Sequence, residues 1–398
     1  MPNSTTLVHS STFPSLLPLP SLDQPLSEAT AADLALELFV AGYAGTSLPD
    51  DYCDLLRRGL SGVILFRRNL QFASDGSLDL ASLVTQTQAV QDAAQHHAAR
   101  LPAICSVDQE GGMVARLKAP LTIFPPMRRL GERGDAALVE NVGRQLGREL
   151  LACGFNVDYA PVLDVDTNPA NPIIGDRSFS RDPQEVARLA GALLRGLQQE
   201  GVLGCGKHFP GHGDTDVDSH LALPSLAHDL DRLKEVELLP FERVADEMAL
   251  VMTAHVLFPQ LDPLWPATLS PQILGPLLRV HCGFQGVIVS DDLEMKGVAN
   301  VLDAGGCVER GLDAGVDLFL VCSRRDTLQE AWVKATAILA GPPESALRQR
   351  ALEAIGRVRA LRQRLTLPRP SVAAILQVLA APTTARLRAE LAAGTLAL

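Results

Sequence analysis

The residues best suited to acid–base, nucleophilic or metal chemistry are concentrated in one segment of fourteen residues, Lys207–His220, which reads KHFPGHGDTDVDSH. It contains three histidines and three aspartates, which are ligand types that zinc accepts. His208, His212 and His220 would supply the nitrogen ligands. However, a Pro-Gly pair prevents the helix that would align the first two histidines, and the zinc motif HExxH is absent. These features count against a metal, and we predict none.

The end of the same segment offers a second kind of chemistry. A carboxylate two residues from an imidazole can orient the ring and favour its protonated form, so Asp218 and His220 would make a general acid near neutral pH. The alternative is that Asp218 and Ser219 only cap a following turn, with His220 on the surface. The residues alone leave both interpretations open.

Asp291 is the other candidate for covalent chemistry, because it comes directly after the apolar run 286–290. At the end of a barrel strand its carboxylate would face an electrophilic carbon as a nucleophile. The alternative role is an N-cap for the next helix. Asp292, its neighbour, competes with it for the nucleophilic role.

The elements that must position these residues follow one pattern: short, continuously apolar runs alternate with helical periodicity. Such runs are typical of strands that are buried on both faces. We expect eight strands, at residues 40–45, 62–66, 103–107, 157–162, 204–207, 250–254, 286–290 and 317–321. Eight strands with intervening helices predict the α/β class and a single (β/α)8 TIM-type barrel. An open doubly wound sheet is the alternative, but the glycine-rich loop usual after its first strand is absent.

Proline marks three helix boundaries between these strands. Asp182 and Ser270 each precede a proline, an arrangement typical of an N-cap followed by the first helical turn. Pro240 is expected to break the helical pattern of residues 229–248 into two pieces.

Polar residues collect where the expected strands end, and in a parallel barrel those ends meet at one face. They are Asp108-Gln-Glu-Gly-Gly after the third strand, Asp164 and later Arg177 after the fourth, Lys207-His208 after the fifth, His255 after the sixth and Asp291-Asp292 after the seventh. One Asp after a strand is usually a cap or a turn residue. Five clusters at corresponding ends predict one active site at the mouth of the barrel.

Composition narrows the class of partner and the compartment. A net charge of −11 and a pI near 5.3 argue against nucleic acid and against an anionic membrane surface. The sequence has no uninterrupted run of about 18 apolar residues, so it predicts no membrane-spanning helix. The seven cysteines are scattered without a CxxC pair. No Lys or Arg precedes Arg57, and prolines interrupt the early apolar runs, unlike a secretory signal. We expect a cytoplasmic protein.

The chain is expected to have three parts. Residues 1–27 read as a flexible extension rich in Pro and Ser, and residues 28–365 as the catalytic barrel. Residues 366–398 read as a short tail with helical character beyond the prolines at 368 and 370.

Taken together, the motifs resemble one family. The pattern KHFPGHGxxxxDSH at Lys207–His220 looks like the signature of the β-N-acetylglucosaminidases of glycoside hydrolase family 3. Four further segments resemble that family in the same order: DQEGG from Asp108, NPIIGDRSF from Asn171, MTAH ending at His255, and SDDLEM from Ser290. The resemblance covers about residues 33–335.

The resemblance implies an activity and a role for each matching residue. Asp291 would be the nucleophile, His220 the general acid/base and Asp218 its partner. The hydroxyls and acetamido group of a terminal N-acetylglucosamine would be held by Asp108, Arg116, Arg177, Lys207 and His208. The family further implies no metal and no organic cofactor. Its cytoplasmic members act on recycled peptidoglycan fragments, which makes muropeptides the expected substrates.

The implied mechanism is retaining, with a covalent glycosyl-enzyme that water hydrolyses. A histidine acid/base would make the rate sensitive to pH around 6.5, and the Gly and Pro residues before it would let the loop move. One departure concerns Met113, where many relatives carry Arg; this removes a charge near the site, while Arg116 is retained.

Three other functions compete with this one. A two-domain β-glucosidase would need a further domain of roughly 200 residues, for which the chain has no room. A phosphorylase would use the same intermediate with phosphate as acceptor, and a histidine acid/base does not repel phosphate. A catalytically silent glycan-binding protein would be expected to lack Asp291, Asp218 or His220, all of which are present.

Overall fold

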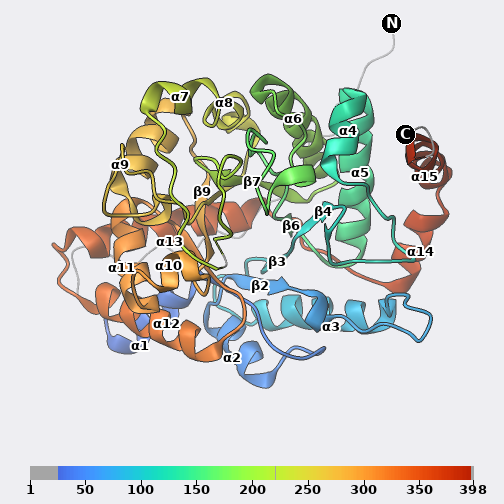
Figure 1. Cartoon of the computed structure of the whole chain (residues 1–398). Coiled ribbons are helices and arrows are strands. Elements are labelled where there is room, and N and C mark those ends of the chain that lie inside the picture. Colours follow the sequence, from blue (N-terminus) through green and yellow to red (C-terminus); the bar gives the residue numbers. More distant parts are fainter. Residues whose placement is uncertain (1–25, 220, 396–398) are drawn as a thin grey trace, which may run out of the picture.

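Eight parallel strands close into a barrel in the computed structural model, which describes residues 26–219 and 221–395 (Figure 1). In order around the barrel they are β1 (Phe39–Ala41), β2 (Gly62–Leu65), β3 (Ile104–Val107), β6 (Val157–Asp158), β7 (Leu203–Phe209), β8 (Leu250–Thr253), β9 (Val287–Asp292) and β10 (Leu318–Val321). Val40 of β1 lies opposite Gly62 on one side and Leu320 on the other, which closes the sheet. The predicted (β/α)8 barrel is confirmed, and closure excludes the open doubly wound sheet.

All eight expected strands are present, because apolar residues line both of their faces. Side chains from every strand fill the inside of the barrel, and Val40, Ile64, Ile104, Leu250 and Leu318 are among them. A second hydrophobic core lies between the strands and the surrounding helices. Strands buried on both sides carry no polar alternation, which is why continuous apolar runs identified them.

The helices form the outer layer and several additions to it. The main ones are α1 (Glu28–Leu36), α2 (Asp50–Arg58), α3 (Leu80–Ala94), α4 (Met127–Arg133), α5 (Ala136–Ala152), α6 (Pro183–Gln199), α7 (Leu230–Glu235), α8 (Leu239–Arg243), α9 (Pro271–Ile273), the π-helix η5 (Leu274–His281), α10 (Lys296–Ala299), α11 (Ala304–Ala314), α12 (Arg325–Ala340), α13 (Ala346–Arg364), α14 (Val372–Ala380) and α15 (Pro382–Thr395). Short 3₁₀ turns are η1 (Arg67–Asn69), η2 (Gly175–Arg177), η3 (Ala245–Glu247) and η4 (Ala267–Leu269). Within the described residues, no helix is long and apolar enough to cross a membrane.

All three expected helix boundaries are present. The Asp182 carboxylate accepts the backbone N–H of Gln184 at the start of α6, and the helical pattern around Pro240 is divided into α7 and α8, with Pro240 in the first turn of α8. Ser270 does precede α9, but its hydroxyl donates to the Asp262 carboxylate at 2.6 Å instead of capping the helix.

Helix α13 seals the amino-terminal end of the barrel. Its residues Val358 and Leu361, with Leu365 just after it, belong to the same core cluster as the inward-facing strand residues. The Arg359 guanidinium pairs with the buried Glu37 carboxylate at 2.6 Å and ties this helix to the end of α1. The opening of the barrel therefore lies at the other end, where the strands terminate.

The last two helices pack beside α5 on the outside of the barrel (Figure 1). The Thr384 hydroxyl donates to Gln145, and Arg388 donates to the Thr122 hydroxyl and the Pro120 carbonyl. These contacts attach α15 to α5 and to the loop that precedes α4.

Candidate active site

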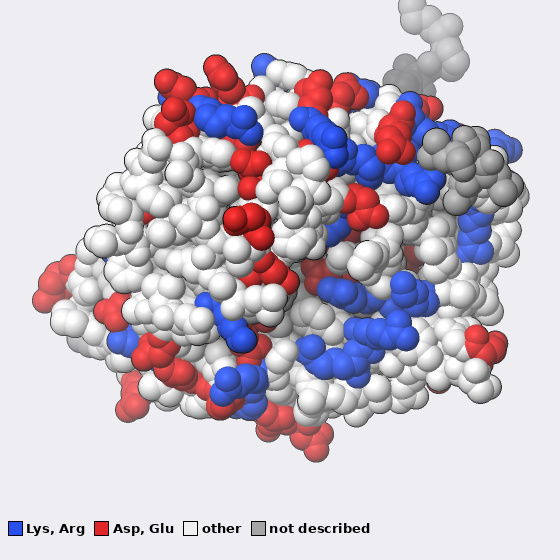
Figure 2. Space-filling model, viewed as in Figure 1, with Lys and Arg blue, Asp and Glu red and all other residues white. Residues whose placement is uncertain are grey.

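A cavity of about 180 Å³ lies at the carboxyl ends of the strands. The side chains that line it include six residues singled out from the sequence: Asp108, Arg116, Arg177, Lys207, His208 and Asp291. They come from the ends of β3, β6, β7 and β9 and from the segments that follow, as the convergence of parallel strands requires. In the view of Figure 2, acidic side chains run toward the centre of the face, and basic side chains lie along one side of them.

Two buried charges, Lys207 and Glu110, and two partly buried ones, Asp108 and Arg177, form a cluster that lines this site. The Lys207 ammonium contacts the Asp108 carboxylate at 2.9 Å and the Glu110 carboxylate at 2.6 Å. Arg177 holds Glu110 with two parallel hydrogen bonds, both of 2.8 Å. Bidentate pairing fixes the guanidinium plane as well as its position. Each buried charge therefore has an opposite partner, as burial demands.

These pairs set the protonation of their members. Burial disfavours the charged form of Glu110, but attraction to Arg177 and Lys207 outweighs it and lowers the pKa of the carboxyl well below its usual range. Burial likewise disfavours the Lys207 ammonium, but Asp108 and Glu110 outweigh it and raise the pKa of the amine. The site thus keeps fixed positive and negative charges side by side near neutral pH, which suits a ligand with many hydroxyl groups.

Arg116 lies at the edge of the cavity, on the strand pair that follows β3. The hairpin strands β4 (Gln109–Gly111) and β5 (Val114–Ala115) present it, and its guanidinium contacts Asp108 at 3.3 Å. It also stacks over the Phe66 ring, with 5.6 Å between guanidinium carbon and ring centroid. Arg116 is therefore a site residue and not a surface charge.

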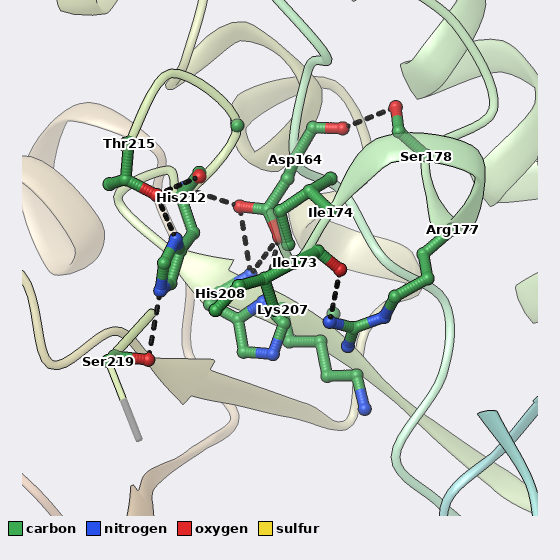
Figure 3. Close-up of polar contacts among 12 residues, drawn as sticks. Asp164, Ile173, Ile174, Arg177, Ser178, Lys207, His208, His212, Thr215 and Ser219 are labelled. Carbon is green, nitrogen blue, oxygen red and sulfur yellow. Dashed lines mark hydrogen bonds and ion pairs between the residues drawn. The ribbon is translucent and has the colours of Figure 1, made fainter. Parts of the chain in front are cut away.

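Asp164 organises the start of the histidine-rich loop (Figure 3). One of its oxygens contacts His208 Nδ1 at 2.7 Å, and the other accepts the backbone N–H of His212 at 2.6 Å. Burial would raise the pKa of Asp164, but attraction to His208 and these hydrogen bonds outweigh it and lower the pKa. A buried carboxylate thus fixes both the His208 ring and the backbone four residues on.

Asp291 and Asp292 differ in what holds them. Both line the cavity. One Asp292 oxygen accepts the backbone N–H groups of Glu294 and Cys322, each at 3.1 Å, so this carboxyl group caps the turn after β9. Asp291 accepts the N–H of Asp292 at 2.8 Å. The next helix, α10, has Met295 at its N-cap position, so neither aspartate is the N-cap that was the alternative role for Asp291.

His255 braces the end of β9 from the neighbouring strand. Its Nε2 is 3.1 Å from the Asp292 carbonyl, and its Nδ1 is 2.9 Å from the Thr268 hydroxyl. Burial lowers the pKa of His255, although Asp291 attracts its charged form. The His255 ring thus orients the backbone beside Asp291.

The far end of the histidine-rich loop is described up to Ser219, which also lines the cavity. Asp218 precedes it, and the predicted acid/base His220 lies outside the described residues. Within residues 26–219 and 221–395, no three His, Cys, Asp or Glu side chains gather as a metal site would require.

Two residues of the site carry roles that sequence reasoning did not assign. Glu110 is the shared acceptor of Lys207 and Arg177, and Asp164 fixes two histidines. Asp164 was identifiable as a polar residue near a strand end. Glu110 gave a weaker signal: a glutamate inside the DQEGG segment, between Gln109 and the glycine pair.

Met113 lies outside the cavity. It is 87% exposed at the turn between β4 and β5, and it does not line the site. The expected loss of a charge near the site is therefore a change at the tip of the hairpin.

A closed barrel with paired buried charges around one small cavity at its carboxyl end has the architecture of a barrel enzyme. The model of the glycosyl hydrolase family 3 N-terminal domain matches residues 51–351. The chain belongs to glycosyl hydrolase family 3. The family predicted from the sequence, and an enzyme of the β-N-acetylhexosaminidase type, are confirmed by this match and by the relatives below.

Three relatives illustrate the similarity. The β-hexosaminidase of Neisseria meningitidis serogroup C is 44% identical over 288 residues, which are 69% of this chain and 75% of that protein. The β-hexosaminidase A of Pseudoalteromonas piscicida is 36% identical over 88% of this chain, which spans 61% of its length. A family 3 β-N-acetylglucosaminidase structure from Paenibacillus superposes with a TM-score of 0.82 at 35% identity, covering 91% of this chain and 68% of that one.

Proposed function

We propose that this protein is a retaining exo-glycosidase that removes a terminal β-linked N-acetylglucosamine, with Asp291 as its nucleophile. The observation that carries the proposal is the position of Asp291 at the end of β9, where it lines the cavity beside the Lys207 cluster. Asp292 lines the same cavity, and one of its oxygens holds two backbone N–H groups of the turn. Family membership and the β-hexosaminidase relatives support this chemistry.

The size of the cavity supports action at a chain end. Its volume of about 180 Å³ lies below the roughly 300–1,000 Å³ of pockets for drug-sized ligands. A site of this size takes one small ring and excludes the interior of a long chain. The enzyme would therefore cleave one terminal residue at a time.

Five residues would hold that sugar: Asp108, Arg116, Arg177, Lys207 and His208. Carboxylate oxygens accept from sugar hydroxyls, and Lys and Arg donate to sugar oxygens. Lys207 uses two of the three N–H bonds of its ammonium on Asp108 and Glu110, and the third can serve a ligand. Since their partners fix these donors, binding would need little reordering of side chains.

The chemical steps follow the two-stage scheme of retaining enzymes. The Asp291 carboxylate attacks the anomeric carbon while His220 donates a proton to the glycosidic oxygen, and the leaving group departs as an alcohol. Water then attacks the glycosyl ester, gives its proton to His220 and releases Asp291 as a carboxylate. Asp218 would orient the imidazole and stabilise its charged form.

Recycled peptidoglycan fragments are the proposed natural substrates, and the cytoplasm is the proposed compartment. Both follow from the resemblance of the Lys207–His220 segment to the cytoplasmic recycling enzymes of the family. The leaving group would then be a muramic acid residue with or without peptide.

The test is Asp291→Ala, with Asp292→Ala as its neighbour control. Loss of the nucleophile should reduce release of an aryl group from an aryl β-N-acetylglucosaminide by about 10⁴-fold or more. Asp292→Ala should stay folded and keep measurable turnover, because only a turn is weakened. Near-normal turnover by Asp291→Ala would exclude this residue as nucleophile. Product analysis of the wild-type reaction with and without phosphate then separates free sugar, expected of a hydrolase, from the 1-phosphate, expected of a phosphorylase.

A further inference from the structure

Ser219 stands between the two residues proposed for acid/base chemistry, and it is held from two sides. It is 3% exposed and lines the cavity. Its hydroxyl is 3.0 Å from His212 Nε2, and its carbonyl accepts the backbone N–H of Gly297 at 2.9 Å. The residues before Ser219 in the same loop, Asp216 and Val217, are exposed. A buried, doubly bonded serine at the end of an exposed loop indicates an anchor.

His212 makes the side-chain half of this anchor (Figure 3). Its Nδ1 lies 2.7 Å from the Thr215 hydroxyl, and that hydroxyl donates its proton to the His212 carbonyl at 3.0 Å. Because a hydroxyl has one proton, Thr215 must accept from Nδ1–H. Nε2 then carries no proton in the neutral ring, so it accepts the Ser219 hydroxyl.

The environment keeps His212 in that neutral state. The ring is 2% exposed, and burial together with repulsion from His208 lowers its pKa to about 4. Its backbone is fixed as well, since Asp164 accepts its N–H and Asn171 donates to its carbonyl at 2.9 Å. His212 is thus a rigid acceptor that does not titrate at neutral pH.

Gly297 makes the backbone half of the anchor from the segment that follows β9. A side chain on Gly297 would begin 3.0 Å from the Ser219 carbonyl and 3.2 Å from the His255 carbonyl, so any larger residue would push these two segments apart by a few tenths of an ångström. The contact joins the loop bearing Asp218 to the segment just after Asp291 and Asp292.

We propose that His212 and Ser219 are positioning residues for the acid/base chemistry, and that their hydrogen bond sets the placement of Asp218, the proposed partner of the acid/base group, relative to Asp291. The inference rests on the proposed function and deepens it. The His212–Ser219 bond acts through Asp218, the neighbour of Ser219, and neither residue contacts the departing oxygen. Its loss therefore slows the first stage when the leaving group needs a proton and spares that stage when it does not. The ratio kcat/KM reports the first stage alone, so the later general-base step does not enter the comparison.

The test compares two substrates in Ser219→Ala, which removes one oxygen atom and leaves the Gly297 contact in place. On a methyl β-N-acetylglucosaminide, a poor leaving group, kcat/KM should fall about tenfold, a fraction of the 10²–10⁴ that a positioned acid supplies. On an aryl glycoside with a strongly acidic phenol, kcat/KM should change less than about twofold, because such a group departs without protonation. His220→Ala provides the reference for the full leaving-group dependence.

His212→Phe and the double variant test whether the two residues act through one bond. Phe replaces the imidazole by another aromatic ring and so removes both nitrogens. If the bond is the route, the double variant loses no more than the worse single variant, because the effects of coupled residues do not add. Thr167→Ala is the matched control, because it removes a 3.0 Å hydrogen bond to Asp214 at the other end of the loop. The ratio of kcat/KM between the two substrates should stay as it is in the wild type.

The positioning role would be overturned if Ser219→Ala lowered kcat/KM equally on both substrates, or lowered it on neither. If His212→Phe does not fold, Ser219→Ala decides alone. Failure of the underlying function looks different: Asp291→Ala would then retain turnover on the acidic aryl glycoside, whatever Ser219→Ala does.

Discussion

Both ends of the barrel bury clusters of opposite charge, but the clusters are built differently. At the carboxyl end, Lys207 and Arg177 share the acceptor Glu110 beside a cavity. At the amino end, the single carboxylate Asp317 receives three arginines, namely Arg279, Arg350 and Arg357, at 2.7, 2.7 and 3.2 Å. One Asp317 oxygen also accepts the Ile288 N–H at 3.0 Å.

The difference lies in what remains beside each cluster. Under Asp317 the barrel is filled by α13, whose Val358 and Leu361 belong to the inner core. Above Lys207 the charged groups face open space. The Asp317 cluster packs against the filled end of the barrel, whereas the paired cluster at the cavity can also bind a ligand. Burial of charge alone does not identify an active site; the cavity beside it does.

The largest effect that would sharpen this contrast is expected from Asp317→Ala. Three arginines would lose their common carboxylate, and two of them are mostly buried. Removing one partner of a buried ion-pair cluster costs about 3–5 kcal/mol. We expect a loss near 3 kcal/mol in urea unfolding, with kcat of the folded enzyme unchanged.

Asp313→Ala serves as the exposed control for that experiment. Asp313 pairs with Arg310 at 2.7 Å on the surface, where such a pair contributes about 0–1 kcal/mol. If Asp317→Ala left stability intact but lowered kcat, the amino-terminal cluster would not be purely structural, and the contrast between the two ends would fail.

The strands and the convergence of the site residues could both be predicted from the sequence. The strands were identifiable because burial on both faces makes their sequences continuously apolar. The meeting of Asp108, Lys207 and Asp291 followed from the geometry of parallel strands, which needs no knowledge of individual contacts.

Contacts between distant residues were beyond such reasoning. The partner of Glu110 could not be read locally, because Arg177 belongs to a different loop, and the same holds for Asp317 and its arginines. His212 was considered as a metal ligand from its residue type, but its two nitrogens are engaged by Thr215 and Ser219. Hydrogen-bond partners of this kind depend on folded geometry, which residue spacing does not encode.

A smaller effect is expected from the pH dependence that Asp292 imposes on stability. Two backbone N–H groups hold the Asp292 carboxyl, whereas three arginines hold the Asp317 carboxylate. Burial first, and then repulsion from Glu294 and Asp291, raises the pKa of Asp292 from 3.8 to about 7. Well below pH 3.8 the group is protonated in both states. As the pH rises to 7 the unfolded chain gives up its proton first, so stability falls.

Asp292→Asn should remove that fall and keep the two backbone hydrogen bonds, since one oxygen accepts both. We expect the wild type to lose about 1–3 kcal/mol relative to the variant between pH 4 and pH 7. The measurement is urea unfolding at several pH values in that interval. Parallel stability curves for the two proteins would show that Asp292 titrates normally.

The smallest effect is expected from removal of divalent metal ions, which tests whether both clusters are balanced by protein charges alone. Asp108 and Glu110 already face Lys207 and Arg177, and Asp317 faces three arginines, so a cation would compete with bonds that exist. Prolonged dialysis against a chelator should therefore change neither turnover of the aryl glycoside nor the unfolding midpoint. If chelation inactivates the enzyme and added zinc restores it, the cluster at the carboxyl ends of the strands rearranges around a metal. The two clusters would then differ in metal binding as well as in the cavity beside them.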